Sequence, residues 1–412
     1  MRVLPAVLVA VAVLTAGCGA PQPPAPPPVQ PLPGTAQIWT RTEGWQQAPA
    51  MPAAAAQRRW SVPVPAGART AANGTGVVVL AVPQGGGTRV DRLDLATGAP
   101  RWSVTVPGTD ARVGLDGWAR PVVTVEADTT TVLDAADGRV LWQAPRDQGD
   151  SVDALPDLLL VRSHTATTAV DRGTGARRWQ VRHQIAPRDG ALVVEDLAPT
   201  AGGPGTDGVA DPATGEPRWT QQNPLFTDVT VVGDRFVRTA DVEPGPDTVT
   251  AYDLATGAQR WTAEVDGIAR AEVTPLDPDT LLVSGGGEVG LGAVAVSAVD
   301  GRVLWRTDRS PSTVLRLDGA PWAYREGDHA VTVLDGRTGA ARQHQNAGSA
   351  VLAGGGIYVT DGVDVVANGL LDLAEHWRLP GVGDVYGLDP VPGGLVTVVG
   401  TAEPRTLAAY LT

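Results

Sequence analysis

Apolar and polar residues alternate in short runs along most of the chain, and turn-forming residues separate the runs. One region shows this clearly, with apolar or alternating runs at Asp228–Val232, Arg235–Thr239, Thr248–Tyr252 and Arg260–Val265. Alternation over four to seven residues is typical of half-buried strands, and the runs are too short for ordinary helices. The pattern therefore predicts four short strands here, with the first of them innermost.

The last two of these runs are joined by the stretch from Ala251 to Trp261. Within it, Asp253 can accept backbone N–H groups in an Asx-type turn, and Gly257 can adopt a positive φ. Trp261 supplies a large apolar anchor at the start of the next strand. We therefore expect a tight turn followed by a strand that buries its Trp.

This order of Asp, Gly and Trp recurs along the chain. The clear copies contain Asp94, Thr97, Gly98 and Trp102; Asp134, Gly138 and Trp142; Asp171, Gly175 and Trp179; Asp211, Gly215 and Trp219; and Asp253, Thr256, Gly257 and Trp261. Later copies drift: the one with Gly301 and Trp305 has lost its Asp, the next ends in Gln343, and Asp372 to Trp377 is shortened. Trp60 stands without a preceding turn. The spacing of roughly 40 residues is that of a propeller blade.

The predicted fold is all-β: a single β-propeller of four-stranded blades over residues 56–412. Two good strands near the C-terminus, Leu395–Val399 and Thr406–Leu411, are not followed by a turn and a Trp strand. We expect the strand around Trp60 to complete that blade, because closure removes exposed sheet edges. Direct counting gives nine blades, but Gly356–Trp377 is compressed and suggests a merged unit, so eight are predicted, with seven or nine as alternatives.

The N-terminus predicts processing and an anchor. Residues 1–17 have the positive end and short apolar run of a signal peptide, and Leu14 to Cys18 resembles a bacterial lipobox. Cys18, the single cysteine, is thus expected to carry lipid. Residues 18–35 form a Pro-rich, uncharged linker that extends at about 3.1 Å per residue. Residues 36–55 are expected to be an irregular lead-in, whose Trp39 and Trp45 either pack against the ring or form a contact surface.

Charge and composition exclude some partners. The formal net charge is −13, and every basic residue is Arg, so a nucleic-acid partner is not expected. The absence of Lys beside abundant Ala, Arg, Gly and Val is typical of a GC-rich genome. With the lipobox, this predicts a lipid-anchored protein on the extracytoplasmic side of the cell membrane of a GC-rich Gram-positive bacterium.

The repeat resembles that of the propellers of pyrroloquinoline-quinone (PQQ) dehydrogenases, whose docking motif runs Ala-x-Asp-x-x-Thr-Gly-x-x-x-Trp. Residues 251–261 match each fixed position. The resemblance covers about residues 56–412 and includes propeller lipoproteins of outer-membrane barrel assembly. It implies that the Asp, Thr and Gly hold the turn, while the Trp packs between neighbouring blades, so these residues are expected to be structural.

The resemblance does not bring the dehydrogenase chemistry with it. Those enzymes place an adjacent cysteine pair over the quinone and hold calcium with oxygen ligands, and this chain has no such pair. The five histidines show no metal-ligand spacing, and Asp277, Asp279 and the carboxylates at 361–364 are expected in turns. No catalytic, cofactor or metal residue is therefore assigned.

These observations predict a non-enzymatic, membrane-anchored scaffold that binds an envelope protein and needs no cofactor. Two alternatives stay open. One is a PQQ-dependent dehydrogenase of sugars or alcohols, with calcium. The other is binding or sensing of a small ligand or glycan at the funnel of the propeller.

Overall fold

The computed structural model describes the ring-forming part of the chain. It covers residues 36–412 except 41–43, 110, 116–120, 128, 146–150, 197–204, 224–227, 241–246, 266–267, 269–270, 286–291, 310, 312, 318–319, 328–329, 346–348, 354–355, 361, 371–372, 383–384 and 401–404. The predicted signal peptide, Cys18 and the Pro-rich linker lie outside the described residues. Among the described residues there is no helix with the length and apolar character needed to span a membrane.

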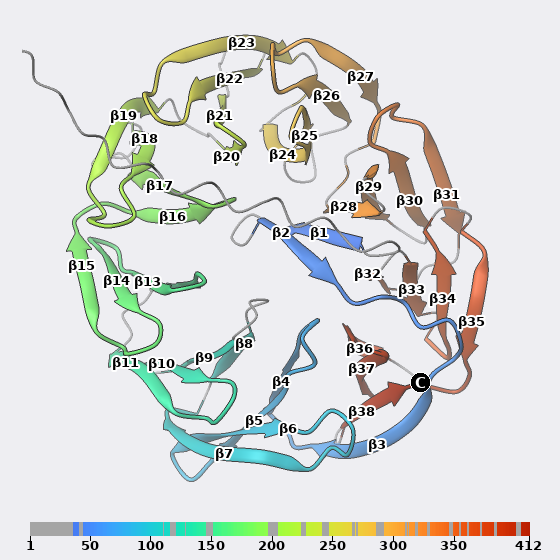
Figure 1. Ribbon diagram of the computed structural model, residues 1–412. Coiled ribbons are helices and arrows are strands. Elements are labelled where there is room, and N and C mark those ends of the chain that lie inside the picture. The colour runs from blue at the N-terminus through green and yellow to red at the C-terminus, as the bar shows by residue number, and fades with distance from the viewer. Residues whose placement is uncertain are drawn as a thin grey trace, which may run out of the picture. The chain divides into compact units, whose positions relative to one another are not determined.

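Nine four-stranded antiparallel units follow one another around a ring (Figure 1). We number them as blades from the first complete one. Blades 1 to 3 contain β4 (Arg69–Ala72), β5 (Val78–Gln84), β6 (Gly87–Leu93) and β7 (Pro100–Pro107); β8 (Arg112–Leu115), β9 (Val122–Glu126), β10 (Thr129–Asp134) and β11 (Val140–Pro145); and β12 (Ser151–Ala154), β13 (Leu158–Arg162), β14 (Thr167–Asp171) and β15 (Arg177–Val181).

Blades 4 to 6 repeat the same order of strands. They contain β16 (Ile185–Arg188), β17 (Ala191–Asp196), β18 (Gly205–Ala210) and β19 (Pro217–Asn223); β20 (Val229–Val232), β21 (Arg235–Ala240), β22 (Asp247–Asp253) and β23 (Gln259–Val265); and β24 (Ala271–Asp277), β25 (Thr280–Gly285), β26 (Ala293–Ser297) and β27 (Val303–Thr307). The first strand of each blade lies nearest the centre and the fourth lies at the perimeter (Figure 1).

Blades 7 to 9 complete the ring. They contain β28 (Thr313–Leu317), β29 (Ala320–Gly327), β30 (Ala330–Asp335) and β31 (Ala341–Gln345); β32 (Ser349–Ala353), β33 (Gly356–Thr360), β34 (Val365–Gly369) and β35 (Glu375–Leu379); and β36 (Val385–Val391), β37 (Gly394–Val399), β38 (Arg405–Leu411) and β3 (Gln57–Val64).

The predicted ring closure is confirmed, and the predicted blade number is wrong. In blade 9, β3 pairs antiparallel with β38, and Trp60 lies opposite Ala409. The preferred count of eight fails because the segment interpreted as compressed belongs to a complete blade, which runs from β32 to β35. Direct counting, which gave nine, was right, because each anchor position marks one blade even where the motif has drifted.

The segment at 36–55 is not irregular throughout. It contains β1 (Ala36–Thr40) and β2 (Gly44–Ala48), which form a hairpin, and β1 pairs with β28 of blade 7. The hairpin therefore extends blade 7 inward into a six-stranded sheet (Figure 1). In the register of the hairpin Trp39 lies opposite Trp45. Their side chains lie outside the described part, so their packing stays a prediction.

The core is distributed between the blades. Each of the nine apolar clusters joins residues of two neighbouring blades, as Val249 and Val283 do between blades 5 and 6. Middle strands such as β34 are buried at all five positions, because both faces of the sheet meet another blade. The outer strand β23 instead alternates buried and exposed residues. A propeller of this kind is held together mainly at the joints between its blades.

Candidate interaction site

The recurrent Asp organises the turn between the third and fourth strands of a blade. In blade 1, Asp94 Oδ1 accepts the N–H of Ala96 and of Thr97, both at 3.0 Å, and the hydroxyl of Thr97. Asp94 Oδ2 accepts from Arg101 Nη2 at 2.6 Å. The Arg101 guanidinium and the Thr97 bonds hold the pKa of Asp94 below its usual range. The carboxylate is thus fully engaged within its own turn.

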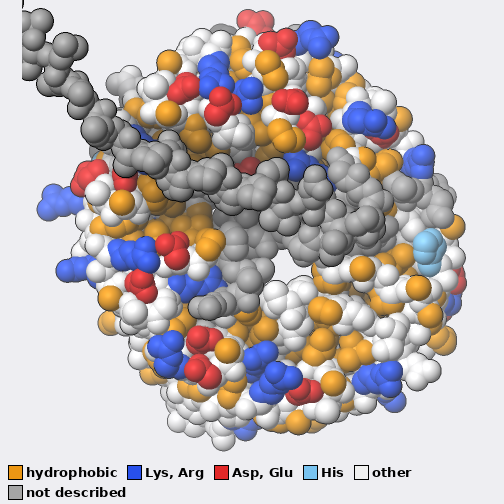
Figure 2. Space-filling view, viewed as in Figure 1, with side chains coloured by type: hydrophobic (Ala, Val, Ile, Leu, Met, Phe, Trp, Pro, Cys, Tyr) orange, Lys and Arg blue, Asp and Glu red, His pale blue; other side chains and the backbone are white. Residues whose placement is uncertain are grey.

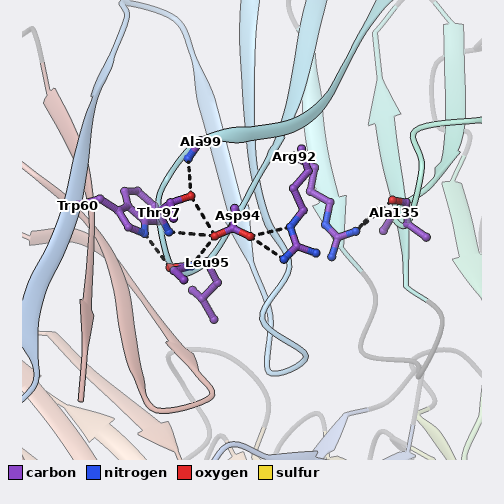
Figure 3. A network of polar contacts seen from close by, with 10 residues as sticks. Trp60, Arg92, Asp94, Leu95, Thr97, Ala99 and Ala135 are labelled. Atoms are coloured by element: carbon purple, nitrogen blue, oxygen red, sulfur yellow. Dashed lines mark hydrogen bonds and ion pairs between the residues drawn. The ribbon is translucent and has the colours of Figure 1, made fainter.

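In six blades the recurrent Trp bonds to the turn of the next blade, as Trp60 does in Figure 3. Trp60 Nε1 of blade 9 donates to the carbonyl of Leu95 in blade 1, at 2.7 Å. The same bond recurs at 3.0 Å from Trp102 to Ala135, Trp179 to Pro212, Trp219 to Leu254, Trp261 to Ala298 and Trp305 to Gly336. In each pair the acceptor follows the first residue of the turn.

The recurrent Gly makes room for the ring of that Trp. Gly257 has a φ of +72°, and a Cβ placed on it would lie 2.7 Å from the Trp219 ring. Gly98, Gly138, Gly215, Gly301 and Gly339 have the same relation to the Trp of the preceding blade. The exception is Gly175, which faces the backbone carbonyl of Leu141 and not the Trp142 ring. A side chain at most of these turns would therefore collide with the neighbouring blade.

The joint between blades 7 and 8 is built differently, and its turn corrects the sequence alignment. The turn begins at Gly369, which bonds to Ala374 and Leu373 as Asp94 bonds to Ala99 and Gly98. Trp377 is therefore eight residues after the start of a full-length turn, and not the end of a shortened copy. Leu373 occupies the Gly position with a φ of +56°. The preceding blade has Gln343 in place of the recurrent Trp, and Leu373 packs in the apolar cluster to which Trp322 of β29 also contributes.

The joint between blades 8 and 9 lacks the usual turn, because the two outer strands of blade 9, β38 and β3, come from opposite ends of the chain. Trp377 Nε1 instead donates to Pro52 O at 2.8 Å. Ala56, which is 3% exposed, packs in the same cluster. The short segment before β3 thus supplies the acceptor that a turn supplies elsewhere.

Charged side chains gather on the inner strands of blades 3 and 4. Asp153 of β12 lies 2.8 Å from Arg162 of β13, and Arg188 of β16 lies 2.5 Å from Glu195 of β17. Burial raises the pKa of Asp153 and of Glu195, although the neighbouring Arg side chains oppose this. Each carboxylate thus has a guanidinium partner within the cluster.

Arg238 extends this cluster into blade 5. Its Nη1 lies 3.3 Å from Asp207 Oδ1 of blade 4, and its Nη2 donates to Tyr252 Oη at 2.8 Å. Asp207 is 1% exposed, and burial raises its pKa to about 6 in spite of Arg238. The cluster contains three pairs of opposite charge, so we interpret it as a polar link between blades.

The remaining candidate groups do not converge on one site. His183 Nδ1 lies 2.6 Å from Asp196 Oδ2, His164 and His376 are exposed, and the side chains of His329 and His344 lie outside the described part. Asp277 accepts the N–H of Asp279 in a turn, as predicted. Within the described residues, no three His, Cys, Asp or Glu side chains are grouped to hold a metal ion.

The surface seen in Figure 2 carries basic and acidic side chains interspersed around the rim. Among the described side chains on that face, basic residues are not gathered into one continuous patch.

The fold and its joints define a class: a nine-bladed propeller of PQQ-like repeats, fastened from blade to blade by Trp. The family model described as outer membrane protein assembly factor BamB matches residues 36–189 and 208–409. The chain belongs to this family. No curated protein matches the sequence.

Three solved structures are similar to this chain. A eukaryotic initiation factor is 9% identical, with a TM-score of 0.54, and the match covers 84% of this chain and 96% of that one. BamB from Moraxella catarrhalis is 15% identical, with a TM-score of 0.46, over 86% and 100% of the two chains. The computationally designed Ika8 protein is 13% identical, with a TM-score of 0.44, over 88% and 100%. At these identities the initiation factor shows a shared fold alone.

Proposed function

We propose that this protein is a lipid-anchored scaffold on the extracytoplasmic side of the cell membrane, where it binds an envelope protein and catalyses no reaction. One observation carries the proposal: the residues of the motif that resembles quinone enzymes form hydrogen bonds and packing contacts within the joints between blades. The Trp donors and the turn carboxylates bind partners within the ring. The family's description as an assembly factor points to the same role.

The anchor is proposed from Cys18 and its lipobox. Cells that express the full chain should incorporate an alkyne analogue of palmitate into it, and the protein should sediment with membranes. Cys18→Ser should abolish the label and release the protein into the soluble extracytoplasmic fraction. A Cys18→Ser variant that stays in the membrane to the wild-type extent would contradict the anchor, whatever the ring does.

The scaffold role requires a specific protein neighbour. In-cell photocrosslinking from exposed positions on the ring, such as Val363 and Val299, should give a reproducible adduct with one envelope protein. The adduct should depend on the position of the probe, because a docked partner covers only part of the surface. If every position gives only a diffuse set of abundant proteins, the scaffold proposal fails.

The dehydrogenase alternative is tested separately. Purified protein with PQQ and calcium is mixed with a sugar or an alcohol and an artificial electron acceptor. We expect no turnover and no spectrum of bound quinone. Reduction of the acceptor that depends on both PQQ and substrate would replace the scaffold proposal with an enzyme.

A further inference from the structure

A partly open cavity of about 370 Å³ lies at blade 4. Apolar residues from three successive blades form its walls: Leu155 and Leu158 from blade 3, Leu192, Val209 and Pro212 from blade 4, and Leu254 from blade 5. Asp157 and Arg218 also line it. The volume lies within the range of about 300–1,000 Å³ that is common for small-molecule sites.

The cavity lies where one backbone bond of the repeat cannot form. In five blades the residue after the first position of the turn donates its N–H to the loop between the first two strands or to the start of the second strand. The bonds run from Ala135 to Pro121, Arg172 to Asp157, Leu254 to Asp234, Ala298 to Asp279 and Gly336 to Pro321. In blade 4 the same position is Pro212, which has no N–H. Its register partner in the loop would be Gly190, because Ala210 lies opposite Leu192. The backbone bond that joins this loop to the turn in the five blades therefore cannot form at Pro212.

An ion pair of the repeat is also missing at the same place. In blades 3 and 5 the Arg of the repeat bridges two carboxylates: Arg178 reaches Asp171 and Asp157, and Arg260 reaches Asp253 and Asp234. In blade 4, Gly190 stands where Asp157 and Asp234 stand in those blades.

Arg218 therefore has one carboxylate where Arg178 and Arg260 have two. Its Nη2 lies 3.1 Å from Asp211 Oδ2, whereas the corresponding distance is 2.6 Å for Arg178 and Arg260. The Arg218 side chain is 48% exposed, and no hydrogen bond within the described part of the chain involves its Nη1.

The walls of the cavity are held in place. The carbonyl of Pro212 accepts from Trp179 Nε1, and the carbonyl of Leu254 accepts from Trp219 Nε1, each at 3.0 Å. The other acidic group at the rim, Asp157, lies 3.1 Å from Arg178, which offsets its charge. An incoming anion thus meets a fixed apolar chamber with a guanidinium at its edge.

We propose that this cavity binds an apolar group that carries a carboxylate. The apolar body would fill the chamber between Leu192 and Leu254. The carboxylate would pair with Arg218, in the place that the side chains of Asp157 and Asp234 take in blades 3 and 5. Guanidinium and carboxylate form charge-assisted hydrogen bonds of matched geometry. The site goes beyond the proposed scaffold role and does not depend on the lipid anchor.

Blade 1 provides the matched control. Arg101 is likewise paired with a single turn carboxylate, Asp94, and Gly76 occupies the position of Gly190. A Cβ on Gly76 would meet Leu95 at 3.1 Å and Pro392 at 3.6 Å, whereas one on Gly190 would meet nothing within 4 Å. The charge pattern is the same, but side chains fill the space in blade 1.

The test measures binding to the purified full chain by titration calorimetry and ligand-observed NMR. The probes are 3-phenylpropionate, its neutral analogue 3-phenylpropanol, and the peptide acetyl-Gly-Gly-Phe with a free or an amidated C-terminus. We expect saturable binding of at least one carboxylate probe, and about tenfold weaker binding of its neutral counterpart. Binding by the propionate indicates a free acid as the natural ligand, and binding by the peptide alone indicates a chain end.

Three variants locate the site. Arg218→Gln and Gly190→Asp should each weaken binding about tenfold, by removing the guanidinium or by supplying an internal carboxylate. Pro212→Ala should also weaken binding, because it restores the N–H that can bond to the Gly190 loop as the equivalent N–H does in five other blades. Arg101→Gln should leave binding unchanged. Thermal melts establish that each variant is folded.

Three outcomes would overturn the proposal. They are no saturable binding of any carboxylate probe, equal binding of charged and neutral probes, or wild-type binding by folded Arg218→Gln. Each of these leaves the scaffold proposal untouched, because that proposal rests on the protein neighbour in the cell.

Discussion

Two joints of the same ring are fastened in different ways. Between blades 4 and 5, Trp219 packs on Gly257, donates to Leu254 O and meets Phe236 edge to face at 5.0 Å. Between blades 7 and 8 the Trp is replaced by Gln343, and Leu370 and Leu373 contribute to the apolar cluster from the turn side. The apolar filling of the second joint thus comes from both blades, with Leu315, Trp322 and Val333 on the side of blade 7.

The backbone changes together with the side chain. In blade 5 the register shifts by one residue between Ala251 and Tyr252, so one residue of the outer strand bulges out just before Trp261. In blade 7, β30 and β31 pair without such a shift. The bulge directs the Arg toward its turn and the Trp toward the next blade. The Trp and the bulge thus occur together in blade 5 and are both absent from blade 7, whereas blade 8 has both although no turn Gly follows in blade 9.

The largest expected effect comes from removing a docking Trp. Trp261→Ala should lower the free energy of unfolding by about 3–5 kcal/mol, because it empties a buried site between blades 5 and 6 and frees the carbonyl of Ala298. Urea denaturation followed by fluorescence measures it. Gln343→Ala, at the equivalent position of the other joint, should cost much less. A Trp261→Ala melt that overlays the wild type would remove the basis of the comparison.

A side chain added at the docking turn should come next. Gly257→Ala should cost about 1–3 kcal/mol, because its Cβ would lie 2.7 Å from the Trp219 ring. Gly190→Ala is the control, since Gly190 also has a positive φ but has open space around it. Thermal melts of the two variants separate the clash from the backbone strain. Equal losses would mean that contact with the Trp ring adds nothing.

At the joint between blades 7 and 8, which has no docking Trp, the turn should not require a Gly. Leu373→Gly should change the free energy of unfolding by no more than about 1 kcal/mol, because relief of the left-handed backbone at φ +56° offsets the loss of a partly buried side chain. The measurement is the same urea titration. A stabilisation of several kcal/mol would show that Leu373 is only strained and contributes no packing.

The smallest effect is one of pH. Arg260 and Thr256 lower the pKa of Asp253 to about 2 in the folded protein, from 3.8. A lowered carboxyl pKa contributes stability that is fully present above the unfolded pKa and is lost as pH falls through the folded value. Asp253→Asn should therefore be less stable than the wild type at pH 7, by a margin that shrinks between pH 4 and pH 2.

The control for this effect is Asp308→Asn, whose carboxylate is 94% exposed. Its stability relative to the wild type should stay nearly constant over the same range. Melting temperatures at half-unit steps of pH provide the readout for both variants. A constant margin for Asp253→Asn would mean that its ion pair with Arg260 does not stabilise the turn.

The sequence alone determined the strands of a blade and the turn and Trp that join it to its neighbours. The Asp, Thr and Gly of a turn lie within five residues, so their geometry is a local property that the order of residues can specify. The recurrence of the Trp near every 40 residues fixed the propeller class, and the orphan strand at Trp60 correctly predicted closure. Where the pattern drifted, at Gly369 to Trp377, the alignment slipped by three residues and misled the blade count.

Tertiary structure decided what depends on contacts between distant parts of the chain. The bond from Trp377 to Pro52, the pairing of β1 with β28, the link from Arg238 to Asp207 and the cavity beside Pro212 all join segments whose separation leaves no periodic signal. Only closing the ring brings these groups together. The repeat therefore specified the structure of the regular blades. The folded ring decided which contacts the positions that depart from the repeat make.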